Sequence, residues 1–177
     1  MMKRMKKIVV AIAMTAMVAA LSACGGKGAG QASGGYTDVV AAQGEVGKML
    51  SDDFTKALEA NAEASAQELA DAVLADEKIP FAGMTMEVEN GVLSGFGNAE
   101  ITGFEQGVMF SPMIGTIPFV GYVFVLPEGA DVTAFTDTLQ SNADLRWNIC
   151  TEADEMVIRT EGNRVFFLMC PLTFEEG

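Results

Sequence analysis

The spacing of apolar residues predicts two helices in the first half of the chain. After Gly44, apolar residues recur every three or four positions, the period of one buried helical face: Val46, Met49, Leu50, Phe54 and Leu58. This helix is expected to end near Asn61. A second helix is expected to start at Ser65, because Ser65 to Glu68 fits a capping box, and Pro80 closes the helical region because its ring lacks an amide donor.

Alternating polarity predicts strands in the middle of the chain. From Met84 to Glu89 apolar and polar residues alternate, as in a half-buried strand. Asn90-Gly91 follows and favours a type I′ hairpin turn. The pattern therefore predicts that residues 92–96 return beside the first strand, with Leu93 across from Val88.

The apolar run from residue 117 to residue 126 predicts a different kind of strand. It is nearly uninterrupted, which suits a central strand buried on both faces. Gly121 inside the run marks either a bulge or a close approach of another segment. Residues 101–110 fit no single pattern.

The last third of the chain predicts one helix and one hairpin. Asp131 is a good N-cap, and the apolar stripe that follows should pack on the sheet. Residues 155–160 and 164–170 read as two strands joined by a turn. The whole order of elements predicts an α+β fold with an antiparallel or mixed β-sheet, helices mainly on one face, and an N-terminal helical pair.

The N-terminus has the pattern of a secretory signal. Its basic start, Lys3 to Lys7, precedes a run of 14 uncharged residues from Ile8 to Leu21. Such a run is shorter than the roughly 20 residues that a membrane-spanning helix needs.

The segment Leu21-Ser22-Ala23-Cys24 resembles, at all four positions, the lipobox of bacterial lipoproteins. The resemblance implies cleavage between Ala23 and Cys24, a diacylglyceryl group on the Cys24 thiol, and anchoring at the extracytoplasmic face of the cell membrane. Two acyl chains hold a protein stably on a bilayer. The alternative is an ordinary signal peptide followed by an unmodified cysteine. We therefore divide the chain into a signal peptide (1–23), a lipidated cysteine with a glycine-rich linker (24–36), and a single α+β domain (37–177).

Two further segments resemble a small uncharacterised domain family found on lipoproteins of Gram-positive bacteria. They are SAQELADAVLADEKIP, which starts at Ser65, and VGYVFVLPEGADVTAFTDTL, which starts at Val120. The resemblance covers roughly residues 65–142 and leaves the rest of the chain without a counterpart. Because that family has no known function, the resemblance implies architecture only.

Composition excludes several classes of function. The chain carries 24 acidic and 11 basic residues, for a net charge of −13. Four of the basic residues lie in the predicted signal, so the remainder holds seven basic residues against 24 acidic ones, a formal charge of −17. Such a chain repels nucleic acid. It has no histidine, which removes the usual general base and the commonest transition-metal ligand. The chain also lacks the G-x-S-x-G and S-x-x-K motifs of serine catalysis.

Three groups of residues are candidate sites. Arg146 and Trp147 could form a recognition spot, since both residue types are enriched in binding hot spots, although core packing is an alternative role for Trp147. Four carboxylates could offer oxygen ligands to Ca²⁺, with a solvated acidic loop as the alternative: Asp144, Glu152, Asp154 and Glu155. Apart from the covalent lipid, no cofactor is expected. Cys150 and Cys170 could form a disulfide or remain free, buried thiols.

These observations favour a membrane-anchored extracytoplasmic lipoprotein that acts as a non-enzymatic binding module. Its expected partner is another envelope protein or an unidentified ligand, and not nucleic acid. The alternative is a small carboxylate-dependent hydrolase that acts on envelope material. That alternative predicts two acids in one cleft with separated pKa values.

Overall fold

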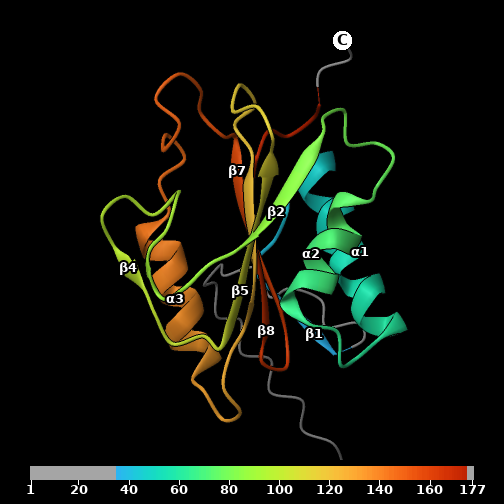
Figure 1. The fold of residues 1–177 in the computed structure, drawn as a ribbon, viewed down its shortest axis with the longest axis vertical. Helices are drawn as coiled ribbons and strands as arrows, with labels where there is room; N and C mark the ends of the chain where they lie inside the picture. Colours follow the sequence, from blue (N-terminus) through green and yellow to red (C-terminus); the bar gives the residue numbers. More distant parts are fainter. Residues whose placement is uncertain (1–34, 175–177) are drawn as a thin grey trace, which may run out of the picture.

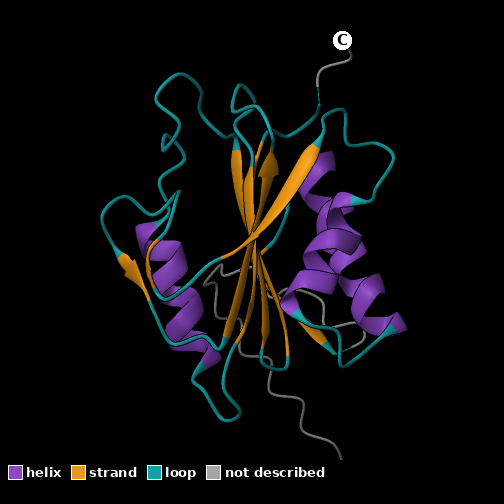
Figure 2. Cartoon of the chain, in the orientation of Figure 1, coloured by secondary structure: helices purple, strands orange, loops and turns teal. Residues whose placement is uncertain are grey.

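A six-stranded sheet separates two apolar layers in the computed structural model, which describes residues 35–174. The strand order is β1-β7-β8-β6-β5-β2, and every neighbouring pair is antiparallel. Helices α1 and α2 cover one face, and α3 covers the other together with a small ribbon formed by β3 and β4 (Figures 1 and 2). The predicted α+β class and the N-terminal helical pair are confirmed.

The elements have the following bounds. The helices are α1 (Glu45–Ala60), α2 (Ala66–Leu74) and α3 (Val132–Asn142). The strands are β1 (Tyr36–Val40), β2 (Gly83–Glu87), β3 (Gly91–Val92), β4 (Glu100–Ile101), β5 (Gln106–Pro112), β6 (Val120–Val125), β7 (Glu155–Glu161) and β8 (Arg164–Cys170).

The helices begin where local sequence signals place them. Ser65 and Glu68 form the predicted capping box: the Ser65 hydroxyl accepts from the Glu68 amide, and the Glu68 carboxylate accepts from the Ser65 amide at 2.8 Å. Asp131 caps α3 by accepting from the Ala134 amide at 3.0 Å. Helix α1 ends at its C-cap Asn61. All three signals depend on neighbours within a few residues, which is why the sequence shows them.

Both faces of the central strands are buried, as the apolar runs predict. On one face, Phe54 of α1 packs against Phe166 of β8, with ring centroids 5.3 Å apart. On the other face, Phe135 of α3 packs against Phe124 of β6 at 5.2 Å. Every residue of β6 is buried. This burial explains why the pattern of β6 is continuous instead of alternating.

The predicted hairpin at Asn90-Gly91 is wrong. Strand β2 pairs with β5, and β3 pairs with β4, so residues 92–96 do not return beside β2. The Asn90 side chain instead ties the segment after β2 to the segment before β5. Its amide donates to the Phe104 carbonyl at 3.1 Å, and its oxygen accepts from the Gly103 amide at 2.6 Å. The sheet places β2 beside a strand about 25 residues away, and that pairing overrides the local turn preference.

The final hairpin is confirmed, and its register opposes Glu155 to Cys170. Cys150 is exposed, Cys170 is buried, and both thiols are free. The expectation of free thiols is therefore met by both cysteines. The expectation that they are buried is met by Cys170 and is wrong for Cys150. Burial, together with the neighbouring Glu155 carboxylate, raises the pKa of the Cys170 thiol, so this cysteine is a packing residue.

The predictions for the N-terminus lie outside the described residues. They comprise the signal peptide, cleavage between Ala23 and Cys24, lipidation of Cys24, and most of the glycine-rich linker. Pairing begins at Tyr36, the last residue assigned to the linker, which lies opposite Glu161 of β7.

The two ends of the sheet, here called the turn end and the loop end, hold different segments. The turn end holds the β7–β8 turn, the segment 126–131 and the start of β1 (Figure 1). The loop end holds three segments that follow or precede strands: residues 113–119, 143–154 and 171–174. The chain therefore enters the fold at the turn end, opposite the three loops.

Candidate functional site

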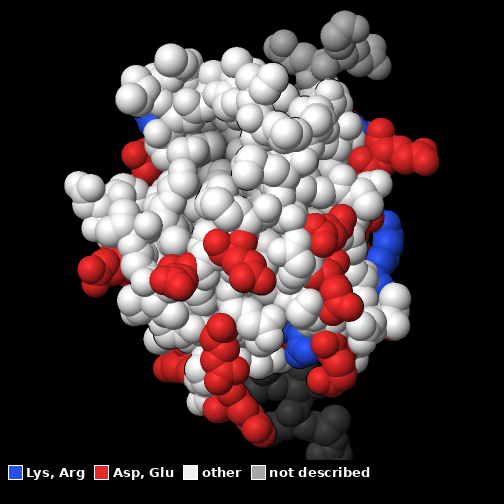
Figure 3. Space-filling view, viewed as in Figure 1, with Lys and Arg blue, Asp and Glu red and all other residues white. Residues whose placement is uncertain are grey.

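Exposed apolar side chains gather at the loop end. The exposed fractions are 65% for Met113, 74% for Ile114 and 99% for Ile149, and Leu172 is also exposed. In the view of Figure 3 this end is almost free of charge except at its margins, whereas carboxylates cover the middle and the opposite end. An apolar patch on so acidic a molecule is a candidate interaction surface.

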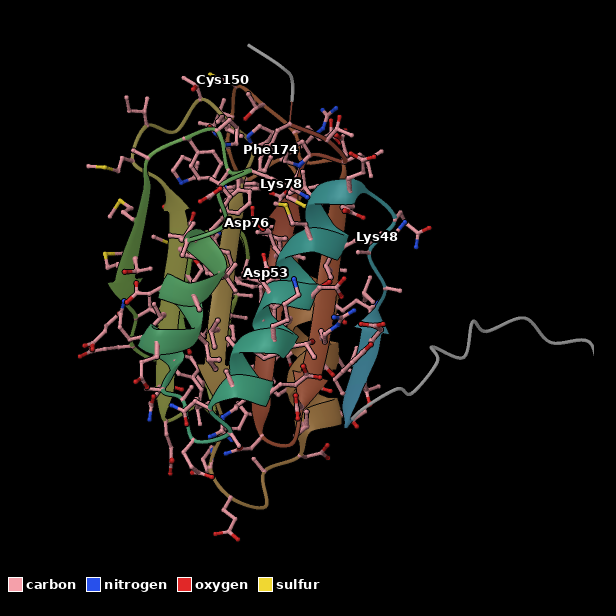
Figure 4. All side chains as sticks on the ribbon, turned by 90° about the vertical axis from the view of Figure 1, so that its right-hand side faces the viewer. Lys48, Asp53, Asp76, Lys78, Cys150 and Phe174 are labelled. Carbon is pink, nitrogen blue, oxygen red and sulfur yellow. The ribbon has the colours of Figure 1, made fainter. Side chains whose placement is uncertain are left out.

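Two cavities open at the loop end and share Ile117 as a wall. The larger has a volume of about 440 Å³ and is lined by three prolines, by Asp154 and by Phe174, which lies at the top of Figure 4. The smaller, of about 320 Å³, is lined by Trp147 and Asn148. The Asn148 side chain donates to the Gly115 carbonyl at 2.9 Å, so it ties loop 143–154 to loop 113–119.

Arg146 and Trp147 lie at this end but have different environments. The exposed Arg146 guanidinium donates from Nε to Glu152 Oε2 at 2.7 Å. That hydrogen bond lowers the pKa of the Glu152 carboxyl. Trp147 is half-buried: it packs against the apolar layer beneath α3 and also lines the smaller cavity. The two roles considered for Trp147, recognition and packing, are thus compatible in this geometry.

The four carboxylates considered for Ca²⁺ do not form one site. Asp144 accepts from the Arg146 amide, Glu152 pairs with the Arg146 side chain, and Asp154 accepts from the Leu172 amide at 3.1 Å. Glu155 is buried. Its carboxylate accepts from the amides of Gln43 and Gly44, just before α1, at 2.7 and 3.1 Å.

The reason for this separation is that β7 starts at Glu155 and turns that side chain towards α1. Within residues 35–174, no group of three or more His, Cys, Asp or Glu side chains could hold a metal ion. The predicted cation site is therefore not assembled in the described structure.

A pair of acids that the sequence did not indicate lies between α1 and the turn after α2. Asp53 and Asp76 lie close together (Figure 4), beside a depression of about 300 Å³ lined partly by alanines. Asp53 Oδ1 accepts from Lys56 at 2.8 Å. Asp53 Oδ2 is buried and, among the described residues, accepts no hydrogen bond. Asp76 lies within hydrogen-bonding reach of the Asp53 carboxyl.

The two carboxyls have pKa values displaced in opposite directions. Burial raises the pKa of Asp53, and the Asp76 carboxylate raises it further. The Lys78 amide donates to Asp76 at 2.8 Å and lowers the pKa of that carboxyl. Sequence reasoning could not single out this pair, because nothing in the spacing of two acids 23 positions apart marks them as neighbours.

Comparison with family models, with curated proteins and with solved structures finds no match for this chain. None of the helices between residues 35 and 174 is both long and apolar enough to cross a bilayer.

Proposed function

We propose that this chain is a lipid-anchored extracytoplasmic lipoprotein and that its loop end is a non-enzymatic binding surface for another envelope protein. One observation carries the proposal: Met113, Ile114 and Ile149 are exposed together, at the end of the sheet opposite the entry point at Tyr36. Burying such a patch against a partner removes apolar surface from water, which favours association.

The tether supports outward presentation of this surface. The sequence predicts a glycine-rich linker at residues 25–35, and a coil of that length and composition spans about 18 Å on average. The described part of the chain begins at the turn end. Strands of seven residues extend about 20 Å further to the loop end. The turn end also carries the acidic residues Glu128, Asp131 and Glu161, which anionic lipid headgroups repel.

Crosslinking in the native membrane tests the proposal. A photoreactive amino acid replaces Ile149 in the full chain, and the matched control places it at Glu128 on the turn end. We expect a discrete adduct with an envelope protein from position 149 and none from position 128. The substitution Ile114→Asp should remove the adduct, because it puts a charge within the apolar patch. Adducts of equal yield from both positions, or none from position 149, would contradict the proposal.

Lipidation is tested by a separate experiment. The full chain should incorporate a labelled fatty acid and sediment with membranes, and Cys24→Ala should abolish both properties. Cys150→Ala is the matched control and should leave both unchanged. Label retained in the Cys24→Ala variant would refute the anchor without bearing on the loop end.

A second candidate function, the carboxylate-dependent hydrolase, is favoured by the Asp53–Asp76 pair alone. Two acids beside one depression with opposite pKa displacements have the signature of an acid and a base. Glu152 and Asp154 lack this arrangement because they line different cavities. The full chain would then cleave cell-wall glycan, and Asp76→Asn would abolish cleavage while leaving the circular-dichroism spectrum unchanged. Absence of cleavage by the wild-type chain, or its persistence in Asp76→Asn, would reject this candidate.

A further inference from the structure

The two edges of the sheet differ in how well they resist pairing with another strand. Strand β1 has a register irregularity between Asp38 and Val40, and Asp38 pairs with the buried Arg159 at 2.6 Å. Bulges and inward-facing charges of this kind protect natural edge strands from added strands. Strand β2 pairs with β5 in unbroken register, contains no proline, lysine or arginine, and carries one charged residue, Glu87 at its end. Of the two edges, β2 is therefore the less protected one.

The backbone of β2 presents free hydrogen-bonding groups. The Val88 amide donates to the Gly107 carbonyl, and the Met113 amide donates to the Ala82 carbonyl. In an antiparallel pair, successive residues point their amides and carbonyls alternately towards and away from the neighbouring strand. Since Ala82 and Val88 bond to the β5 segment, the amides and carbonyls of Gly83, Thr85 and Glu87 point away from β5. Among the described residues, no hydrogen bond satisfies the amides of these three positions.

The side chains of β2 divide into an apolar face and an acidic face. Met84 and Met86 are exposed on one face, with exposed fractions of 38% and 48%. On the opposite face the Thr85 hydroxyl contacts Gln67 and Asp71 of α2 at 2.8 and 3.0 Å.

Beyond Thr85 a groove of about 610 Å³ contains three glutamates and neither lysine nor arginine: Glu87, Glu89 and Glu105. In Figure 1 β2 runs across the front of the molecule, and the same view in Figure 3 shows carboxylates gathered on this side.

We propose that β2 is a docking edge for an extended segment of a partner protein in which apolar and basic residues alternate. The segment adds to the sheet as a further antiparallel strand. Its backbone bonds to Gly83, Thr85 and Glu87, its apolar side chains cover the two methionines, and its basic side chains face Asp71 and the groove. This mode of recognition obtains affinity from the backbone and specificity from alternate side chains.

Charge argues against a second copy of this chain as the occupant. A second copy brings its own glutamates and a net charge of −13, or −17 without the predicted signal, so like charges repel as the two edges approach. A basic segment is instead attracted, and its binding should weaken with added salt. The docking edge begins beside the loop end, where Gly83 pairs with Pro112, but it uses different residues, so either proposal can fail without the other.

The test uses a fluorescent peptide of alternating valine and lysine, (Val-Lys)₃, and the full chain in non-ionic detergent. Fluorescence anisotropy should show saturable binding. Thr85→Pro removes an amide that points away from β5, so proline leaves the β2–β5 ladder intact, yet it should weaken binding at least tenfold. Thr85→Val retains that amide and loses only the hydroxyl, so it should bind within about twofold of wild type.

Modified peptides keep the proposal falsifiable if the proline variant does not fold. In an antiparallel strand, the lysines share the face of Thr85 and their amides point at β2. N-methylation of the lysine amides should abolish binding, N-methylation of the valine amides should not, and (Val-Glu)₃ should not bind. Equal effects of the two methylation patterns, or equal binding of (Val-Lys)₃ and (Val-Glu)₃, would overturn the proposal. A β2-dependent dimer of the chain that excludes the peptide would also overturn it.

Discussion

Arg159 connects three elements through a single buried side chain. Its Nε donates to Asp38 of β1 at 2.6 Å, and its Nη1 donates to the Ser51 carbonyl and the Thr55 hydroxyl of α1 at 2.9 and 3.1 Å. The guanidinium also lies 4.4 Å from the ring centroid of Tyr36. The side chain of this one cation therefore links the first strand to α1.

Arg159→Met should lower the free energy of unfolding by roughly 3 kcal/mol, because it leaves the Asp38 carboxylate largely buried without its partner. Arg146→Met is the matched control, since it breaks an arginine–glutamate pair that is exposed on both sides and should leave stability unchanged. Urea unfolding of the three proteins measures both effects. If both variants lost the same free energy of unfolding, burial would not determine how much an ion pair contributes to stability.

Asp53→Asn should change how stability depends on pH. The raised pKa of Asp53 means that the folded state holds this proton more tightly than the unfolded state. The stabilisation that this proton gives is complete when the pH is below the pKa of Asp53 in the unfolded state. It is lost as the pH rises through the higher pKa of Asp53 in the folded state. Asparagine keeps a donor towards Asp76 at every pH, so Asp53→Asn should gain stability over wild type between pH 3 and pH 7.

Urea unfolding at pH 3 and pH 7 measures this gain as the difference in free energy of unfolding between Asp53→Asn and wild type. The contributions of the other titrating groups largely cancel in this difference. Asp137→Asn, on an exposed position of α3, is the control and should follow wild type at both pH values. If the difference between Asp53→Asn and wild type is the same at both pH values, folding does not raise the pKa of Asp53.

Gly121 shows, at the level of elements, how β5 and β6 fit together. It lies opposite Phe110 of β5, and the ring of Phe110 occupies the space that a side chain at position 121 would need. Of the two roles predicted for this glycine, a close approach is thus the correct one. The same ring stacks on Phe166 with centroids 5.9 Å apart, so the glycine lets one aromatic side chain reach the α1 and α2 layer.

Gly121→Ala should destabilise the fold by about 1–3 kcal/mol, because its Cβ would overlap the Phe110 ring and force it to move. Gly115→Ala is the control. An added Cβ there meets open space, so its effect should be small. Thermal unfolding measures both variants. Combining Phe110→Leu with Gly121→Ala should cost less than the sum of the single changes, and strict additivity would contradict the proposed contact.

The elements that sequence predicted are those specified by neighbouring residues. Ser65 and Asp131 marked helix starts because a cap is a local contact, and the run through β6 marked a buried strand because both of its faces are covered. The pairing of β2 could not be read in this way, since it depends on which distant strand the sheet places beside it. The residue types of Arg146 and Trp147 were enough to indicate their loop as a candidate site. The apolar patch could not be predicted in this way, because it combines loops that are far apart in the sequence.

Charged and apolar residues are unevenly distributed between the two ends of the sheet. Carboxylates gather at the turn end and an apolar patch lies at the loop end, while the chain enters at Tyr36 on the turn end. A lipid on Cys24 would thus hold the acidic end nearer the bilayer. Repulsion from anionic headgroups would then orient the long axis of the sheet away from the surface.

This orientation predicts different distances of the two ends from the bilayer. A spin label on Cys150, which is exposed in loop 143–154, should lie beyond the reach of nickel-chelating lipids in vesicles that carry the full lipidated chain. A label introduced by Glu128→Cys in a Cys150→Ser background should relax faster, because residue 128 lies at the turn end. Buried Cys170 should remain unlabelled. Faster relaxation at Cys150 than at position 128 would place the apolar loops against the membrane, and their partner would then be lipid instead of protein.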